Sequence, residues 1–284
     1  MALHADIDAR AMFLRACALD VETIKPGNVS VTSAGHGMHA AQFIASANAA
    51  AMGLFAPHAR VGQRILDAVR ATLNAVRCNT NLGIVLLCAP LCAALEHVST
   101  DAHDWPHATR AALSALDIDD ARLAYEAIAL ANPGGLGDAP EQNVHAPPTV
   151  DLRTAMTLAA DRDSIALQYA NGFADVFDMA QRIEPSNETQ AMFDTFLTFL
   201  CTWPDSHIVR KHGAAMAQSV TQEALNYLPR AQNIPSPELM QWDAALKARG
   251  INPGTSADLS VATLFVALVM HQTRRMNKKW HGTC

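Results

Sequence analysis

Lysine is scarce in this chain of 284 residues, which has only five, two of them among the last seven positions. Charged residues make up 17% of the sequence, and the net charge is −6. Because no basic stripe runs through the sequence, duplex nucleic acid is not an expected partner. Aromatic residues are also few, at 6%, whereas alanine fills 53 positions. This composition favours packed helices over strands.

The sequence also lacks a CxxC pair and an apolar run long enough to cross a membrane. Its six cysteines lie mostly in apolar, helix-like runs, which is typical of reduced thiols in the cytoplasm. The longest apolar run, Leu82 to Leu95, has fourteen residues, and a membrane span needs about twenty. Charged residues such as Asp8 and Arg10 interrupt the N-terminus, which argues against a signal peptide. We therefore expect a cytoplasmic protein that has no membrane partner.

Several motifs of well-known enzyme classes are missing. The chain has no GxxxxGK[ST] or GxGxxG loop, which argues against P-loop and Rossmann nucleotide sites. It also has no GxSxG elbow and no HExxH pair. Any chemistry must therefore depend on a different arrangement of residues.

Apolar residues recur at helical spacing along almost the whole chain. The pattern predicts one all-α domain over residues 1–284, with about ten or eleven helices. Breaks rich in proline and glycine separate the helices, at Lys25–Asn28, Asn132–Gly137 and Asn252–Gly254. The expected helices include 7–23, 39–54, 61–77, 81–97, 163–181, 206–228 and 256–274. Alanine-rich helices often leave one apolar face for a second subunit, so a homodimer is also expected.

Polar residues and glycines gather at predicted helix ends. A helix N-terminus offers unpaired N–H groups and the positive end of the helix dipole, which together suit phosphate. Asn79–Asn81 and Pro253–Ser256 have this character, although plain N-capping is the more common reason for each motif taken alone. Arg210 and Lys211 supply cations, with a solvent-exposed helix face as the alternative. Asp258 lies in the first turn of the last expected helix, where it either complements the dipole or binds Mg²⁺ beside phosphates.

Taken in the order in which they follow along the chain, the motifs at these helix ends resemble those of the triphosphoribosyl-dephospho-CoA synthase family. The resemblance extends over about residues 10–275. The matching motifs are Lys25-Pro-Gly-Asn-Val29, Gly35-His-Gly-Met38, Asn79-Thr-Asn-Leu-Gly83, Arg210-Lys211 and Asn252-Pro-Gly-Thr-Ser-Ala-Asp258. The resemblance implies an all-α enzyme in which the 2′-hydroxyl of dephospho-CoA attacks ribose C1 of ATP and adenine leaves. Such a reaction passes through oxocarbenium-like charge, which a carboxylate would stabilise. It also needs an acid for the leaving base and cations for the triphosphate.

The resemblance implies a role for each candidate residue. Lys25, His36, His39 and Asp258 are the candidates for catalysis. Asp258 and Glu141 are candidate Mg²⁺ ligands, and Asp138 and Glu141 lie in a loop that we expect to contact the acceptor, unless that loop is only structural. The residues expected to bind the nucleotide are Gly27, Asn28, Asn79, Thr80, Asn81, Gly83, Arg210, Lys211, Gly254 and Ser256.

The chain also departs from the family pattern. Ser30 stands where an acid often follows the Lys-Pro-Gly motif, Gly35–His39 has no acid, and Asn81-Leu82 replaces a His-Lys pair of the family. These departures suggest a divergent branch similar to proteins of tetrahydromethanopterin- and methanofuran-dependent one-carbon metabolism. The alternatives are therefore an ATP-using enzyme that assembles a one-carbon cofactor from its precursor, or a helical protein that binds nucleotide without catalysis.

Overall fold

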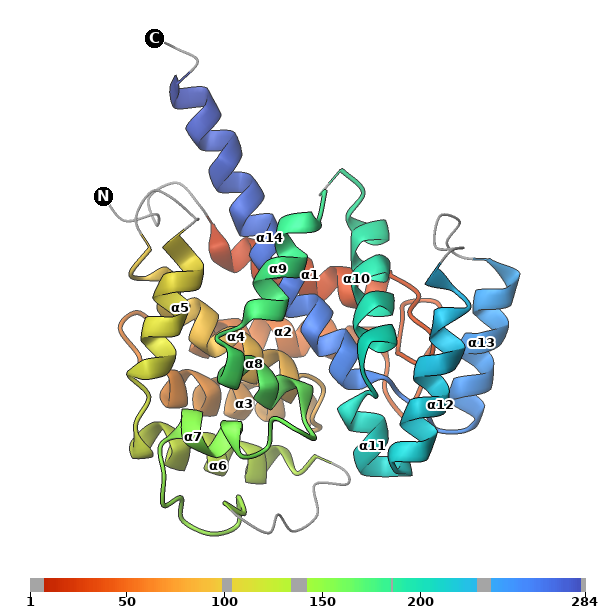
Figure 1. Ribbon diagram of the computed structural model, residues 1–284, viewed down its shortest axis with the longest axis horizontal. Helices are drawn as coiled ribbons and strands as arrows, with labels where there is room; N and C mark the ends of the chain where they lie inside the picture. Colours follow the sequence, from red (N-terminus) through yellow and green to blue (C-terminus); the bar gives the residue numbers. More distant parts are fainter. Residues whose placement is uncertain (1–7, 99–103, 134–141, 185, 229–235, 282–284) are drawn as a thin grey trace.

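The computed structural model describes residues 8–98, 104–133, 142–184, 186–228 and 236–281, with side chains as far as 275. In these ranges the chain forms fourteen α-helices and no strand, apart from two isolated bridges near residues 30–38. The all-α prediction is therefore confirmed (Figure 1). The helices are α1 (Ala9–Glu22), α2 (Ala40–Leu54), α3 (Val61–Val76), α4 (Leu82–Leu95), α5 (Trp105–Ser114), α6 (Ile118–Ala131), α7 (Leu152–Thr157), α8 (Ser164–Asn171), α9 (Ala174–Arg182), α10 (Glu188–Thr202), α11 (Ser206–His212), α12 (Ala214–Leu225), α13 (Pro237–Ala248) and α14 (Gly254–His281).

Helix α14 runs through the centre of the larger hydrophobic core. It contacts α1, α4, α9 and α10. Phe265 on this helix meets the rings of Phe13, Phe55 and Trp105 edge-to-face, with centroids 5.6–6.2 Å apart. Such edge-to-face contacts add to the gain from apolar burial. Its segment Gly254–Arg275 is long and apolar enough to cross a membrane. However, 83% of the 18-residue apolar stretch in this segment is buried inside the protein. The segment therefore serves as a core helix in this fold.

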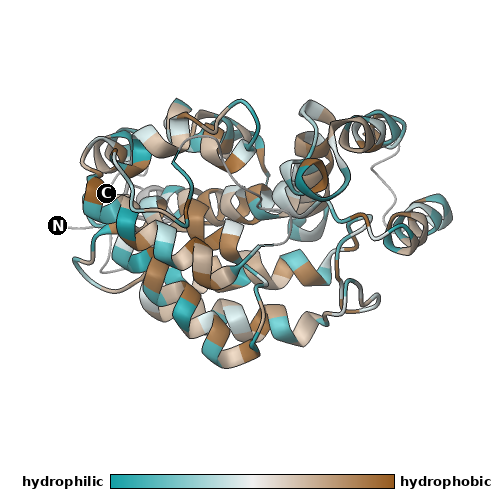
Figure 2. Ribbon diagram, turned by 90° about the horizontal axis from the view of Figure 1, so that it is seen from below, coloured by the Kyte–Doolittle hydropathy of each residue, from teal (hydrophilic) through white to brown (hydrophobic). Residues whose placement is uncertain are grey.

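A second apolar cluster lies among α10, α11, α12 and α13. Phe196, Leu200 and Val220 are completely buried in it, and Leu246 joins them from α13. Figure 2 shows helices striped by apolar and hydrophilic residues, as expected when one face of each helix packs inward. The two clusters adjoin at the first turn of α14, which places this helix end between them.

The structure has more helices than the ten or eleven predicted, in part because two of the expected helices are interrupted. The segment 163–181 divides into α8 and α9 at Gly172 and Phe173, both with positive φ, and 206–228 divides into α11 and α12 at Gly213 (φ 85°). Positive φ ends an α-helix and is adopted most easily by glycine. At the other end of the chain, α14 continues to His281, beyond the expected end at residue 274.

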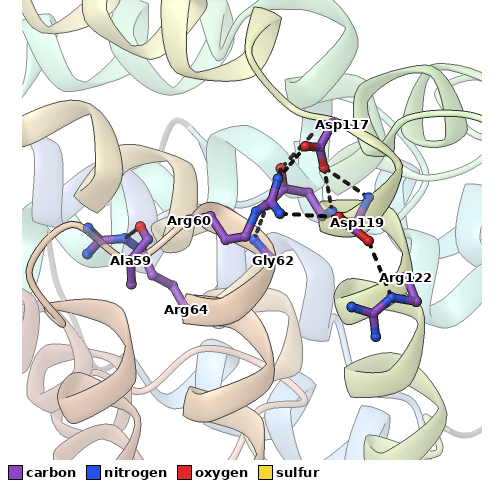
Figure 3. A network of polar contacts seen from close by, with 8 residues as sticks. Ala59, Arg60, Gly62, Arg64, Asp117, Asp119 and Arg122 are labelled. Carbon is purple, nitrogen blue, oxygen red and sulfur yellow. Dashed lines mark hydrogen bonds and ion pairs between the residues drawn. The ribbon is translucent and has the colours of Figure 1, made fainter.

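A network of ion pairs fixes α6 against α3 (Figure 3). Arg60 contacts the carboxylates of Asp117, Asp119 and Asp120, and Asp120 also accepts a hydrogen bond from the Gly62 N–H at 2.8 Å. Asp117 caps the N-terminus of α6. The network therefore sets the position of a helix whose later residues line the pocket described next.

Candidate active site

A pocket of about 620 Å³ opens where several helix ends meet. Its wall is built from the end of α1, the starts of α4, α8, α11 and α14, and parts of α6 and α7. Most of the predicted site residues lie in this wall, although they are distant in sequence. Those that line the pocket are Asn28, His36, Asn79, Thr80, Asn81, Gly83, Arg210, Lys211, Gly254 and Asp258.

The pocket contains an unusual concentration of polar atoms without partners. In the described structure, five buried side-chain atoms of pocket residues have no hydrogen bond: Asp20 Oδ1, Asn28 Oδ1, Asn81 Nδ2, His207 Nε2 and Arg210 Nε. Of these, Asp20 Oδ1 is ion-paired with Lys25. Buried polar groups are nearly always hydrogen-bonded, because an unpaired one costs about 1–3 kcal/mol. Donors and acceptors that stay unpaired around one cavity indicate a site shaped for a polar ligand.

Asp258 presents its carboxyl group at the inner end of the pocket. No hydrogen bond or ion pair joins this group to any residue within the described ranges. It lies against the backbone of Gly83, where an added Cβ would be only 2.0 Å from Asp258 Oδ2. Burial, together with the nearby carboxylates of Asp20 and Asp205, raises the pKa of Asp258 well above its usual value. The carboxyl group is therefore suited to hold a proton.

Lys25 does not reach the pocket. Its side chain is fully buried, and its Nζ contacts both the main-chain carbonyl of Asp20 and, at 2.9 Å, the Asp20 carboxylate. Asp20, in the last turn of α1, is the residue that lines the pocket. Lys25 therefore places a buried positive charge directly beside a pocket carboxylate.

The first turns of α11 and α14 share one acid, Asp205. Its carboxylate accepts hydrogen bonds from the N–H and hydroxyl of Ser256 at 2.7 and 2.8 Å, and from the N–H groups of His207 and Ile208 at 2.9 and 3.1 Å. The N–H of Ser256, which we expected to face phosphate, is thus occupied by Asp205. This arrangement fixes the two helix ends, and with them Gly254 and His207, at the pocket wall.

The start of α4 stays open toward the pocket. Asn79 Oδ1 accepts from the Leu82 N–H at 3.1 Å, Thr80 donates to Ser46 at 2.7 Å, and Thr72 donates to Asn81 at 3.1 Å. These bonds fix the turn that precedes the helix. The N–H groups of Gly83 and Ile84, in the first turn, have no acceptor within the helix, and both residues line the pocket. This helix end is therefore a suitable anion site.

Basic residues of α11 form one side of the pocket. Arg210 pairs with Asp163 at 2.6 Å, and Asp163 in turn caps α8. Lys211 is exposed at the pocket edge. Burial and the charges of Lys211 and Arg210 lower the pKa of His207 to about 3. The histidine is consequently a neutral hydrogen-bonding group beside two cations.

Four predicted residues are not among those that line the pocket. Lys25 lies behind Asp20, Ser256 bonds to Asp205, Gly27 donates its N–H to Asp243 at 2.8 Å, and His39 is an exposed N-cap of α2. Of the two histidines proposed as acids, only His36 reaches the pocket, and its Nε2 lies 2.8 Å from the Gly27 carbonyl oxygen. The predicted acceptor residues Asp138 and Glu141 lie outside the described ranges.

Sequence reasoning missed several pocket residues. Asp20 and Asp163 line the cavity but belong to no recognisable motif. His207 and Gln142 also line it, and they lie beside the candidates Arg210 and Glu141 in sequence but had no role assigned to them. Asp20 and Asp163 each carry one weak signal, since Asp20 is an acid late in an apolar helix and Asp163 stands in an N-cap position. Such signals are common at purely structural positions, so they could not identify a site.

The described residues do not fit a Mg²⁺ site built by the protein alone. Over these ranges, no group of three His, Cys, Asp or Glu side chains is arranged to hold a metal. Asp20 and Asp163 are already ion-paired, which leaves the carboxyl of Asp258 as the one candidate in the described wall. Phosphates and water can supply most ligands of Mg²⁺, so any such ion would depend on the nucleotide.

Comparisons with known proteins gave a match to one family model and to a solved structure. A family model described as ATP:dephospho-CoA triphosphoribosyl transferase matches residues 7–276. The chain is also similar to the crystal structure of a proposed triphosphoribosyl-dephospho-CoA synthase from Archaeoglobus fulgidus, with 26% identity and a TM-score of 0.66. That match covers 80% of this chain and 98% of the archaeal one. A search of curated proteins gave no match.

Proposed function

Because the chain belongs to the ATP:dephospho-CoA triphosphoribosyl transferase family, whose members are ATP-dependent transferases, we propose that this pocket transfers the triphosphoribosyl group of ATP to dephospho-CoA. A bond forms between the 2′-hydroxyl oxygen of dephospho-CoA and ribose C1 of ATP, while the bond from C1 to adenine N9 breaks. The hydroxyl loses a proton and the departing adenine gains one. The observation that carries the proposal is the unpartnered Asp258 carboxyl beside unsatisfied polar groups.

The cationic side of the pocket is the proposed triphosphate site. Among the described residues Arg210 Nε has no hydrogen-bond partner, and Lys211 is exposed at the edge of the cavity. The backbone N–H groups in the first turn of α4 add uncharged hydrogen-bond donors. Charge-assisted hydrogen bonds from such groups are short and strong. Together they would hold the triphosphate while the ribose lies deeper, near Asp258.

Two carboxyl groups then divide the chemistry at C1. Asp20, paired with buried Lys25, supports a negative charge that would stabilise the oxocarbenium-like transition state. Asp258, with its raised pKa, would protonate adenine as it leaves. We assign Asp258 to proton transfer rather than to metal binding, because no second protein ligand stands free beside it in the described wall.

The proposal is tested by identifying what leaves ATP. Purified protein is incubated with ATP and dephospho-CoA, with and without Mg²⁺, and the products are separated by chromatography. Adenine as the released product supports the proposal. Release of ADP or AMP instead would support the alternative of a different cofactor-assembling enzyme. Tight ATP binding without any product would indicate a protein that binds nucleotide without catalysis.

Lys211→Ala is expected to weaken ATP binding without unfolding the chain. A hydrogen bond to a charged group contributes about 1.5–3 kcal/mol, so KM for ATP should rise about tenfold or more, with a smaller change in kcat. Initial rates at varied ATP concentration measure both constants. Arg122→Ala removes a cation from exposed α6, outside the pocket, and should change neither. Equal effects of both variants would contradict the triphosphate assignment.

Gly83→Ala is expected to displace the Asp258 carboxyl. The new Cβ would lie 2.0 Å from Asp258 Oδ2 and 2.8 Å from Ile165 Cδ1, so one of these groups must move. A displacement of about 1 Å in a reacting group can lower the rate about 10²-fold, whereas overpacking costs about 1–3 kcal/mol of stability. We therefore expect a folded enzyme with a much reduced kcat for adenine release. A variant with full kcat would show that Asp258 need not occupy its observed position.

A further inference from the structure

The pocket has two chemically different ends. Toward α11 it carries Arg210, Lys211 and the unpaired nitrogens of His207 and Arg210. Toward α6 and α7 the residues of these two helices that line it are uncharged, although exposed Arg162, in the turn that follows α7, also lines the cavity. In Figure 1 these two helices lie to the left of α11, and α8 begins between the two sides. The uncharged wall comprises Tyr125, Ile128, Gln142, Val144, Leu152 and Met156.

Packing and hydrogen bonds hold the side chains of the uncharged wall in place. Tyr125 and Leu152 are buried, and Val144 and Met156 pack against the main core. Tyr125 Oη donates to Gln142 Oε1 at 3.3 Å, which also accepts the Thr149 N–H at 3.2 Å, while Gln142 Nε2 donates to Thr149 Oγ1 at 2.7 Å. These bonds orient the Gln142 amide. Among the described residues they use only one of its two Nε2 hydrogens, so the other can donate to a ligand carbonyl.

From this arrangement we infer that the wall formed by α6, α7 and residues 142–149 binds the pantetheine arm of the acceptor. The inference rests on the proposed function, because it takes dephospho-CoA as acceptor. The arm is uncharged, carries two methyl groups on one carbon and contains two amides. Apolar side chains with one oriented amide donor match this chemistry, whereas a second polyanion would find no cation among the six residues of the wall.

The wild-type protein tests the inference through direct binding. Isothermal titration with pantetheine alone, which lacks the nucleotide, is expected to show binding that saturating dephospho-CoA abolishes and saturating ATP leaves in place. During turnover, pantetheine should inhibit competitively with dephospho-CoA and not with ATP. Displacement of pantetheine by ATP, or no heat of binding at all, would overturn the inference.

A matched pair of variants locates the site. Met156→Asp places a charge in the uncharged wall and should raise the Kd for pantetheine and the KM for dephospho-CoA by about tenfold or more, with KM for ATP unchanged. Leu158→Asp makes the same type of change two residues away, at an exposed side chain outside the pocket, and should leave all three constants unaltered. Unchanged pantetheine binding by folded Met156→Asp would reject the assignment.

The experiments can contradict the transferase reaction and the pantetheine assignment separately. Adenine release from the wild type with dephospho-CoA reports on the proposed function, whereas pantetheine titration needs no turnover. Adenine release combined with no pantetheine binding would overturn only the assignment of the uncharged wall. Pantetheine binding without adenine release would overturn the transferase reaction and keep the ligand assignment.

Discussion

Asp258→Asn is expected to lower kcat for adenine release by about 10²–10⁴, the range that general acid catalysis contributes. Asparagine keeps the size of the side chain but has no proton of suitable acidity to donate. Binding of ATP should change little, because Lys211, Arg210 and the α4 N-terminus would still hold the triphosphate. Kinetics with saturating dephospho-CoA measure the effect, and a Kd for ATP close to the wild-type value separates catalysis from binding.

The pH dependence of kcat tests the role of the Asp258 carboxyl group independently. An acid catalyst must be protonated, so the wild-type kcat should fall as the pH rises through the raised pKa of Asp258. The Asp258→Asn variant cannot lose this proton, and its remaining activity should lack that limb of the profile. If the limb persisted in the variant, another group would be the acid.

The stability of Asp258→Asn should change in the opposite direction to its activity. The pKa of Asp258 is higher in the folded than in the unfolded chain, so the folded state binds more protons and loses stability as the pH rises through the folded-state pKa. At neutral pH the wild type carries this penalty and the asparagine variant does not. The variant should therefore be at least as stable as the wild type in denaturant unfolding.

Asp194→Asn provides the matched control for Asp258→Asn. Asp194 on α10 is also an aspartate whose pKa burial raises, but it does not line the pocket. The same chemical change there should leave kcat and its pH profile unaltered. A comparable loss of activity in both variants would indicate a general response to replacing an aspartate whose pKa is raised.

Lys25→Met is expected to destabilise the fold by about 3–5 kcal/mol, the typical cost of leaving one member of a buried ion pair without its partner. Lys25 is fully buried, and the side chain of Asp20 is only 9% exposed. Methionine has a similar length but no charge, so the Asp20 carboxylate would remain buried and unpaired. Urea unfolding measures the change, and Lys211→Met, at an exposed position, should cost little by comparison.

A second substitution separates the structural role of Lys25 from its functional role. Adding Asp20→Asn to Lys25→Met removes the uncompensated charge and should restore much of the lost stability. Activity should stay low, because the carboxylate proposed to stabilise positive charge at C1 is then absent. A stable double variant with wild-type kcat would show that the ion pair serves the fold alone.

Helical periodicity predicted the fold class because nearly every segment buries one apolar face. It failed at interruptions, since 163–181 and 206–228 keep apolar spacing across Gly172 and Gly213. A glycine inside a helical pattern is tolerated or ends the helix according to its tertiary surroundings. The local sequence does not contain that information.

Motifs at helix ends predicted much of the pocket wall, because those ends converge on one cavity. They could not show which residues face it. Lys25 belongs to the most recognisable motif, yet its Nζ lies against α1, and its charge reaches the pocket only through Asp20. Ser256 likewise bonds to Asp205, fifty-one positions away. Both outcomes depend on pairings between distant segments, which a single sequence does not reveal.

The central claim is that this pocket moves the triphosphoribosyl group of ATP to an acceptor hydroxyl. The most direct measurement uses ATP labelled with ¹³C in its ribose, incubated with dephospho-CoA and the wild-type protein and followed by mass spectrometry. The account predicts unlabelled free adenine together with a dephospho-CoA adduct that carries the labelled ribose and three phosphates. Labelled ribose found only in ADP, AMP or unreacted ATP would contradict it.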